Sequence, residues 1–278
     1  MQHKVIKLDI DYEKLGGKVG DFQPTMTLYL PDNSPEIDMA RKRPTVIICP
    51  GGGYHFTSDR EAEPVALKFA AEDCNAIVLR YSVAPRRFPT QIMEMAKVIA
   101  TVRENAEQWN VDTGKIVVLG FSAGGHLCAS YGTLWNRDFV KDLCGYTDGE
   151  HKPNGMILSY PVITGMGNTH KGSFEHLLGE GVNDAKLLEL VSAERQVNED
   201  TPPAFIWHTW SDPGVPAARS IDMAAALTAQ GIPTEMHLFP RGPHGISLAN
   251  DTVYKQCPEG IEECREWIYL DIRWLKNL

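Results

Sequence analysis

A serine, an aspartate and a histidine stand in this sequence where they could act as nucleophile, orienting acid and base. Ser122 lies in Gly120-Phe121-Ser122-Ala123-Gly124, which matches the pattern G-x-S-x-G, and Asp212 and His244 follow it in that order. A serine hydroxyl becomes a strong nucleophile when an adjacent base takes its proton. The three residues therefore predict acyl transfer through a Ser-His-Asp triad, in the chain order Ser, Asp, His.

The residues around Ser122 predict the turn that such a nucleophile needs. Ile116 to Leu119 form a short apolar run typical of a strand buried on both faces, and small and apolar residues suited to a packed helix follow Gly124. A sharp strand-to-helix turn holds the serine in a strained conformation with its hydroxyl above the sheet. Taken alone, the pattern could equally be a glycine-rich turn with a surface serine.

Three consecutive glycines follow an earlier buried strand, in Pro50-Gly51-Gly52-Gly53-Tyr54. Ordering glycine has a high entropic cost, so three in a row after a strand need a reason. Bare backbone N–H groups can approach a ligand closely, and we expect those of Gly52 and Gly53 to bind an oxyanion together with the N–H of Ala123. The alternative interpretation is a flexible loop.

His244 is preferred as the base and Asp212 as the orienting acid, because each follows a predicted strand. Asp222 and Asp200 compete with Asp212 but do not follow a strand closely. Six other histidines are alternative candidates for the base. We expect His126 to pack or form hydrogen bonds in the helix after Ser122, and His208 and His237 to be structural within strands. His55, His170 and His176 lie in loops or the excursion and could touch substrate.

Alternating strand and helix patterns predict an α/β fold that can position these residues. Strands are expected at 3–12, 25–30, 45–49, 76–79, 116–119, 155–160, 204–208 and 234–239. Helices are expected at 60–72, 90–109, 173–178, 184–191, 216–230 and 260–277. This order predicts a mostly parallel sheet of about eight strands with helices on both faces, and ligands in such sheets bind at the carboxyl ends of the strands. We expect a single domain over residues 1–278, in which 162–201 forms either a small lid or an ordinary helical excursion.

The composition of the chain argues against several classes of binding partner. The net charge of −9 over 278 residues, with no basic run, argues against nucleic acid and anionic membranes. No signal-peptide pattern opens the chain and no apolar run reaches membrane-spanning length, so we expect a cytoplasmic protein. None of the six cysteines forms a CxxC pair, which argues against zinc. We expect the cysteines to be free thiols, and the state of Cys257 and Cys264 is left open. We expect no metal or cofactor.

Five motifs together resemble the α/β-hydrolase esterases, and more narrowly the bacterial acetyl xylan esterase-like group with its carbohydrate esterase and feruloyl esterase branches. They are Pro50-Gly51-Gly52-Gly53-Tyr54; Arg80-Tyr81-Ser82-Val83-Ala84-Pro85 with Phe88-Pro89; Gly120 to His126; Asp212 with Val215-Pro216; and Gly242-Pro243-His244-Gly245. Lipase-type relatives carry histidine where Pro50 stands and tend to have an N-terminal helical cap. The strand-like start of this chain predicts little or no cap, and hence a more open site.

The resemblance implies a serine esterase that removes acetyl groups from oligosaccharides such as those derived from xylan. A general carboxylesterase or feruloyl esterase is the alternative, and a serine peptidase or a non-catalytic binding module is less favoured. The partner is then a small-molecule or oligosaccharide ester, and homo-oligomer formation stays open. Tyr54 and Trp210 adjoin site residues and could stack on a sugar, or simply pack against their own loops.

Overall fold

An eight-stranded sheet with strand order β1-β2-β4-β3-β5-β6-β7-β8 forms the centre of the molecule. The structure is a computed structural model and describes residues 1–15, 22–147 and 149–278. The strands are β1 (Gln2–Lys7), β2 (Thr25–Leu30), β3 (Arg43–Cys49), β4 (Asn75–Arg80), β5 (Val111–Phe121), β6 (Gly155–Ser159), β7 (Ala204–Thr209) and β8 (Thr234–Phe239). The six strands from β4 to β8 in this order are mutually parallel, whereas β2 runs antiparallel to β1 and β4. The predicted mostly parallel α/β sheet, with an antiparallel pair at its edge, is confirmed.

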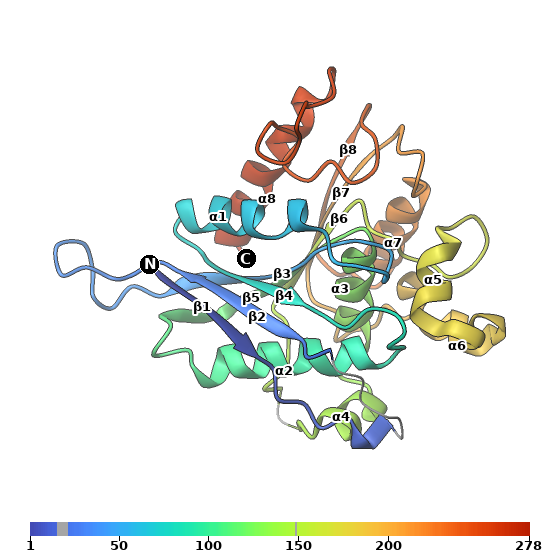
Figure 1. Ribbon diagram of the computed structural model, residues 1–278, viewed down its shortest axis with the longest axis horizontal. Coiled ribbons are helices and arrows are strands. Elements are labelled where there is room, and N and C mark those ends of the chain that lie inside the picture. The colour runs from blue at the N-terminus through green and yellow to red at the C-terminus, as the bar shows by residue number, and fades with distance from the viewer. Residues whose placement is uncertain (16–21, 148) are drawn as a thin grey trace.

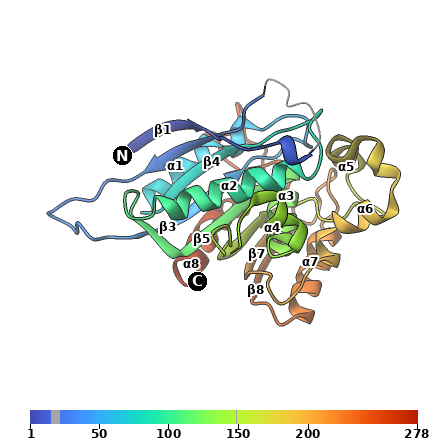
Figure 2. The same ribbon diagram turned by 90° about the horizontal axis from the view of Figure 1, so that it is seen from below.

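Helices cover both faces of the sheet. They are α1 (Glu63–Ala71), α2 (Thr90–Glu104), α3 (Ala123–Leu134), α4 (Asp138–Cys144), α5 (Lys171–Leu178), α6 (Ala185–Leu190), α7 (Ala218–Ala229) and α8 (Trp267–Lys276). Helices α1 and α8 lie over one face, and α2, α3 and α7 over the other (Figures 1 and 2). Alternate side chains of β3 enter the two cores, Ile47 and Cys49 on the α2–α3 side and Val46 and Ile48 on the α1–α8 side.

The bounds of several elements differ from the sequence prediction, and one helix was not predicted. β1 ends at Lys7 and not at residue 12, and α2 ends at Glu104 although Trp109 still packs in the core. Asn110 has a φ of 53°, in the left-handed region, so the chain turns there directly into β5. The short helix α4 was not predicted, because seven residues show too little of a helical period to be recognised.

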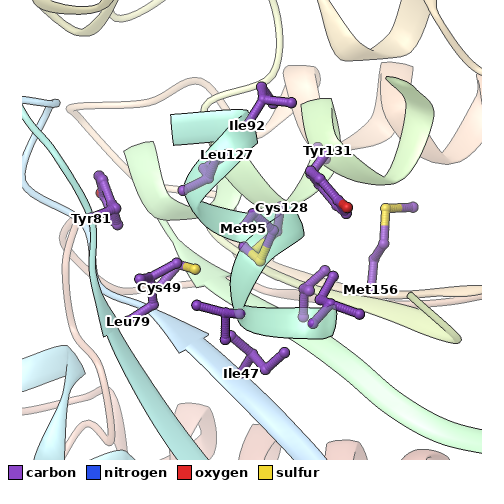
Figure 3. Close-up of a cluster of buried hydrophobic side chains, with 14 of the residues drawn as sticks. Ile47, Cys49, Leu79, Tyr81, Ile92, Met95, Leu127, Cys128, Tyr131 and Met156 are labelled. Atoms are coloured by element: carbon purple, nitrogen blue, oxygen red, sulfur yellow. The ribbon is translucent and has the colours of Figure 1, made fainter. Parts of the chain in front are cut away.

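The core beneath the turn at Ser122 includes side chains of β3, β4, β6 and the helices α2 and α3. Figure 3 shows Ile47, Leu79, Met95, Leu127 and Met156 meeting between the sheet and helices α2 and α3. All five are essentially inaccessible to solvent. Close packing of this kind resists displacement, so the start of α3 is held rigidly at the end of β5.

The excursion, residues 162–201, is packed against the body of the protein. It contains α5, α6 and the short 3-10 helices η3 (Gly179–Asn183) and η4 (Ala193–Arg195). The carbonyl of Val191 accepts a 2.7 Å hydrogen bond from Nε2 of His126 in α3, and the carbonyl of Leu177 accepts one of 2.9 Å from the N–H of Phe88. Phe174 and Leu177 are buried. These contacts join the excursion to α3 and to the segment before α2 in this structure.

All six cysteines lie in the described residues and are free thiols, Cys257 and Cys264 included. Within the described ranges, no helix is both long enough and apolar enough to span a membrane.

Candidate active site

Ser122 occupies the turn between β5 and α3 with φ 52° and ψ −117°, a conformation that L-residues rarely adopt. The flanking glycines are required by close backbone contacts. A Cβ on Gly120 would lie 2.1 Å from the carbonyl oxygen of Gly124, and a Cβ on Gly124 would lie 2.0 Å from that of Cys49. The pattern G-x-S-x-G is thus explained, because the turn leaves no room for a side chain at either glycine position.

Ser122, His244 and Asp212 lie side by side, although they are far apart along the chain. Nε2 of His244 is 2.7 Å from Oγ of Ser122, and Nδ1 of His244 is 2.7 Å from Oδ2 of Asp212. Asp212 follows β7 and His244 follows β8, whose carboxyl ends meet the end of β5 at one edge of the sheet. The structure thus joins the three predicted residues in one hydrogen-bonded row.

Asp212 is buried and surrounded by hydrogen-bond donors. Its Oδ1 accepts from the N–H groups of Gly214 and Val215 at 2.8 and 2.9 Å, and its Oδ2 receives contacts from His244 and His208. Burial by itself would raise the pKa of Asp212, but these hydrogen bonds and the attraction of His244 outweigh it and hold the pKa below its usual range. The aspartate is therefore fixed as a carboxylate against the imidazole of His244.

The glycine loop after β3 presents free N–H groups beside Ser122. Gly52 and Gly53 have φ values of 130° and 63°, and their N–H groups meet no acceptor in the described part of the chain. Ala123 is the first residue of α3, so its N–H has no partner within that helix. These three groups can donate to a negatively charged oxygen, and the N-terminus of α3 favours that charge.

A cavity of about 380 Å³ opens over Ser122 and His244. It is lined by the glycine loop and the segment after it, by the excursion and by the loop that carries His244. The lining residues are Gly52, Gly53, His55, Phe56, Ser58, Arg60, Glu61, Ser122, His170, His176, His244 and Gly245. The three loop histidines expected to touch substrate, His55, His170 and His176, all belong to this lining.

Glu61 and Tyr160 support the site through hydrogen bonds, and no sequence pattern predicted either residue. Glu61 is buried and accepts hydrogen bonds from the N–H of Gly51 at 2.8 Å and from Oη of Tyr160 at 2.6 Å. Oη of Tyr160 also accepts from the N–H of Ser247, and the ring of Tyr160 meets that of His244 edge to face. Burial raises the pKa of Glu61 despite these hydrogen bonds. The pair connects the glycine loop to the loop of His244.

The two predicted sugar-stacking aromatics do not line the cavity. Tyr54 is only 1% exposed, and its hydroxyl is 2.8 Å from Nδ1 of His126. Trp210 is 66% exposed and is not among the lining residues. The expectation of substrate contact is wrong for Tyr54, because its side chain is buried against His126, and it stays a prediction for Trp210.

His126 packs and forms hydrogen bonds, as expected. Its Nε2 donates to the carbonyl of Val191 and its Nδ1 accepts from Tyr54, while burial lowers its pKa to about 4. His208 is buried within β7 but touches Asp212, a contact that its position in a strand did not predict. His237 bonds to Glu235 on β8. In the described ranges, no cluster of three or more His, Cys, Asp or Glu side chains is arranged to hold a metal ion.

The strand order, the strained serine after β5 and the acid and base after β7 and β8 define an α/β hydrolase. The chain belongs to the BD-FAE family, whose model matches residues 26–227.

Known proteins of this kind are similar over most of the chain. Endo-1,4-beta-xylanase B of Butyrivibrio fibrisolvens is 40% identical over 220 residues, which cover 77% of this chain and 34% of that protein. Acetylxylan esterase of Xylanibacter ruminicola is 28% identical over 258 residues, covering 89% of this chain and 48% of the relative. The crystal structure of the acetyl ester-xyloside bifunctional hydrolase of Caldicellulosiruptor lactoaceticus superposes with a TM-score of 0.82 at 34% identity, covering 99% of this chain and 96% of that one.

The chain spans about a third to a half of the length of these two curated relatives. It spans nearly the whole of the solved hydrolase.

Proposed function

We propose that this protein is a serine esterase that hydrolyses short-chain acyl esters through Ser122, His244 and Asp212. The observation that carries the proposal is the hydrogen-bonded row of 2.7 Å contacts from Ser122 through His244 to Asp212. The three unpartnered N–H groups beside it supply the complementary oxyanion site.

The mechanism follows from the positions of these groups. His244 Nε2 takes the hydroxyl proton as Ser122 Oγ attacks the ester carbonyl, and Asp212 stabilises the imidazolium that forms. The N–H groups of Gly52, Gly53 and Ala123 bind the oxyanion of the tetrahedral intermediate. His244 then protonates the departing alcohol, leaving an acyl group on Ser122. Water, activated by the same imidazole, releases the acid and restores the serine.

The proposed substrate is an acetylated oligosaccharide derived from xylan. The support is the similarity to a protein named acetylxylan esterase and to a hydrolase named for acetyl ester and xyloside substrates. The open cavity of about 380 Å³ is within the range of small-molecule sites and exceeds what an acetyl group fills. This chemistry needs no metal or cofactor.

The test compares the protein with its Ser122→Ala variant on 4-nitrophenyl acetate and on acetylated xylo-oligosaccharides. We expect the variant to lose about 10⁴-fold or more in kcat, because the nucleophile is absent. Ser34→Ala, in the loop before β3 and away from the cavity, serves as the matched control. Normal turnover by Ser122→Ala would reject the mechanism. Activity on the simple ester without acetate release from the oligosaccharide would reject the substrate.

A feruloyl esterase or general carboxylesterase is the second candidate, favoured by one observation. Phe56 lines the cavity with 57% of its surface exposed, and an aromatic acyl group could stack on its ring. Methyl ferulate and esters of increasing acyl length distinguish the two proposals. Preference for methyl ferulate or for butyryl and longer chains would favour the second.

A further inference from the structure

Three imidazole rings form one wall of the cavity and are not used by the Ser-His-Asp row. His170 and His176 come from the excursion, and His55 comes from the segment after the glycine loop. The rings of His55 and His176 are stacked, with centroids 5.0 Å apart and an interplanar angle of 26°. Within the described residues this group is not arranged to hold a metal ion.

A backbone carbonyl determines which nitrogen of His176 carries hydrogen. Nδ1 of His176 is 2.9 Å from the carbonyl oxygen of Gly53. A carbonyl oxygen can only accept, so Nδ1 is the donor. In the neutral imidazole, Nε2 is then an acceptor on a side chain that lines the cavity. The same ring therefore supports the glycine loop and offers a lone pair for a ligand.

His170 also lies near Gly53 of the glycine loop. Its Nδ1 is 2.8 Å from Oγ of Ser173, and its Cε1 would lie 3.8 Å from a Cβ on Gly53. Burial, together with the charges of His244 and His176, lowers the pKa of His170 and favours the neutral ring. A neutral imidazole has one donor and one acceptor nitrogen, so with Nδ1 held by Ser173 its Nε2 is available to a ligand.

The departing alcohol of the ester occupies the same cavity as these histidines. His244 Nε2 has to reach the alcohol oxygen in order to protonate it, and His170 and His176 line the cavity together with His244 and Ser122. The hydroxyl groups of an alcohol that fills this cavity can therefore reach His170 and His176. Sugar hydroxyls can pair with the ring nitrogens of imidazoles, and sugar C–H faces match the apolar ring surfaces.

We infer that His170 and His176 form a subsite that binds hydroxyl groups of the sugar alcohol while the acyl group is transferred to Ser122. This inference rests on the proposed esterase function and specifies which part of the protein recognises the sugar. It also gives the excursion a role, because α5 carries His176 and begins directly after His170.

Asparagine variants distinguish the contributions of the two ring nitrogens of each histidine. The amide of Asn places its N–H near the position of Nδ1, so His176→Asn and His170→Asn keep a donor toward the carbonyl of Gly53 and Oγ of Ser173 but remove Nε2. We would measure kcat/KM for acetylated xylo-oligosaccharide and for 4-nitrophenyl acetate, whose alcohol has no further hydroxyl. His3→Asn, on the edge strand β1, is the matched control.

Each variant should lose roughly five- to tenfold in kcat/KM on the sugar ester, mainly through a higher KM, and clearly less on 4-nitrophenyl acetate. Equal losses on both substrates, or no loss on either, would overturn the subsite. A second measurement is calorimetric binding of deacetylated xylo-oligosaccharide to Ser122→Ala, which adding His176→Asn should weaken by a similar factor. If the parent protein releases no acetate from the glycan but the Ser122→Ala form binds it in this His176-dependent way, the proposed substrate fails and the subsite stands. Absence of any binding that depends on these histidines would reject the subsite alone.

Discussion

His208 and Asp212 are joined by a buried hydrogen bond in which Nε2 of His208 lies 3.1 Å from Oδ2 of Asp212. The same oxygen is 2.7 Å from Nδ1 of His244. Nε2 of His208 also lies 3.1 Å from the carbonyl oxygen of Val215, which can only accept, so this nitrogen carries hydrogen and donates. His208 thus positions the carboxylate of Asp212 for its hydrogen bond with His244.

His208→Leu should weaken this arrangement, whereas His208→Gln, whose amide nitrogen falls near the position of Nε2, should largely preserve it. The lost hydrogen bond to a carboxylate corresponds to about 1.5–3 kcal/mol, so Asp212 in the leucine variant should have a higher pKa. The folded-state pKa of Asp212 is depressed, so its contribution to stability is present above the unfolded value and is lost as pH falls through the folded value.

The stability deficit of His208→Leu, measured by urea unfolding, should therefore be largest near pH 7 and shrink below about pH 4, near the unfolded pKa of aspartate. A deficit that does not vary with pH would indicate lost packing in place of the lost hydrogen bond.

Asp212→Asn should lower kcat on 4-nitrophenyl acetate by about 10⁴-fold, because an amide cannot stabilise the imidazolium and favours the wrong tautomer of His244. Asp222→Asn is the control: Asp222 lies on α7, 3.1 Å from Arg219, and outside the cavity lining. A fall of less than about tenfold in Asp212→Asn would show that another group orients the base.

Gly52→Ala and Gly53→Ala should differ, although the two residues are adjacent. A Cβ on Gly52 would lie 2.2 Å from the carbonyl oxygen of Phe56, so the loop must move and its oxyanion donor is lost. We expect a loss of about 10²–10³ in kcat for Gly52→Ala. At Gly53 the nearest atoms are 3.8 Å away, and the strain of φ 63° in alanine costs only about 1–2 kcal/mol. Equal kcat values in the two variants would contradict this assignment of the loop.

Asp271 should destabilise the protein at neutral pH. Neither of its carboxylate oxygens has a hydrogen-bond partner among the described residues, and the side chain is fully buried in α8. Burial, with a smaller effect of Glu235, raises its pKa. A group whose folded pKa is raised contributes its full stability below the unfolded pKa and loses it as pH rises through the folded one.

Unfolding free energies of the parent protein and Asp271→Asn, measured from pH 4 to pH 8, would test this. The variant should become more stable than the parent as pH rises above about 4. Asp251→Asn, at an exposed position, provides the control for a simple change in net charge. A difference between Asp271→Asn and the parent that stays constant over this range would mean that the carboxyl group has a compensating partner.

Much of the fold and the row of three side chains could be predicted from the sequence. The strands were recognisable from short apolar runs, and parallel strands end at one edge, so residues directly after β5, β7 and β8 had to be close neighbours. Gly120, Gly124 and Gly52 were informative because the close backbone contacts found here exclude a side chain at each of them.

The roles of Tyr54, Trp210, His208 and Glu61 were decided only by the tertiary structure. Each lies within a few residues of a recognised motif, yet Tyr54 is buried against His126, Trp210 faces solvent, and His208 and Glu61 support Asp212 and the glycine loop. Short sequence motifs and hydrophobic periodicity predict the path of the backbone, since both reflect local geometry. The direction and partners of a side chain depend on residues brought together from distant parts of the chain, and those contacts leave no local pattern.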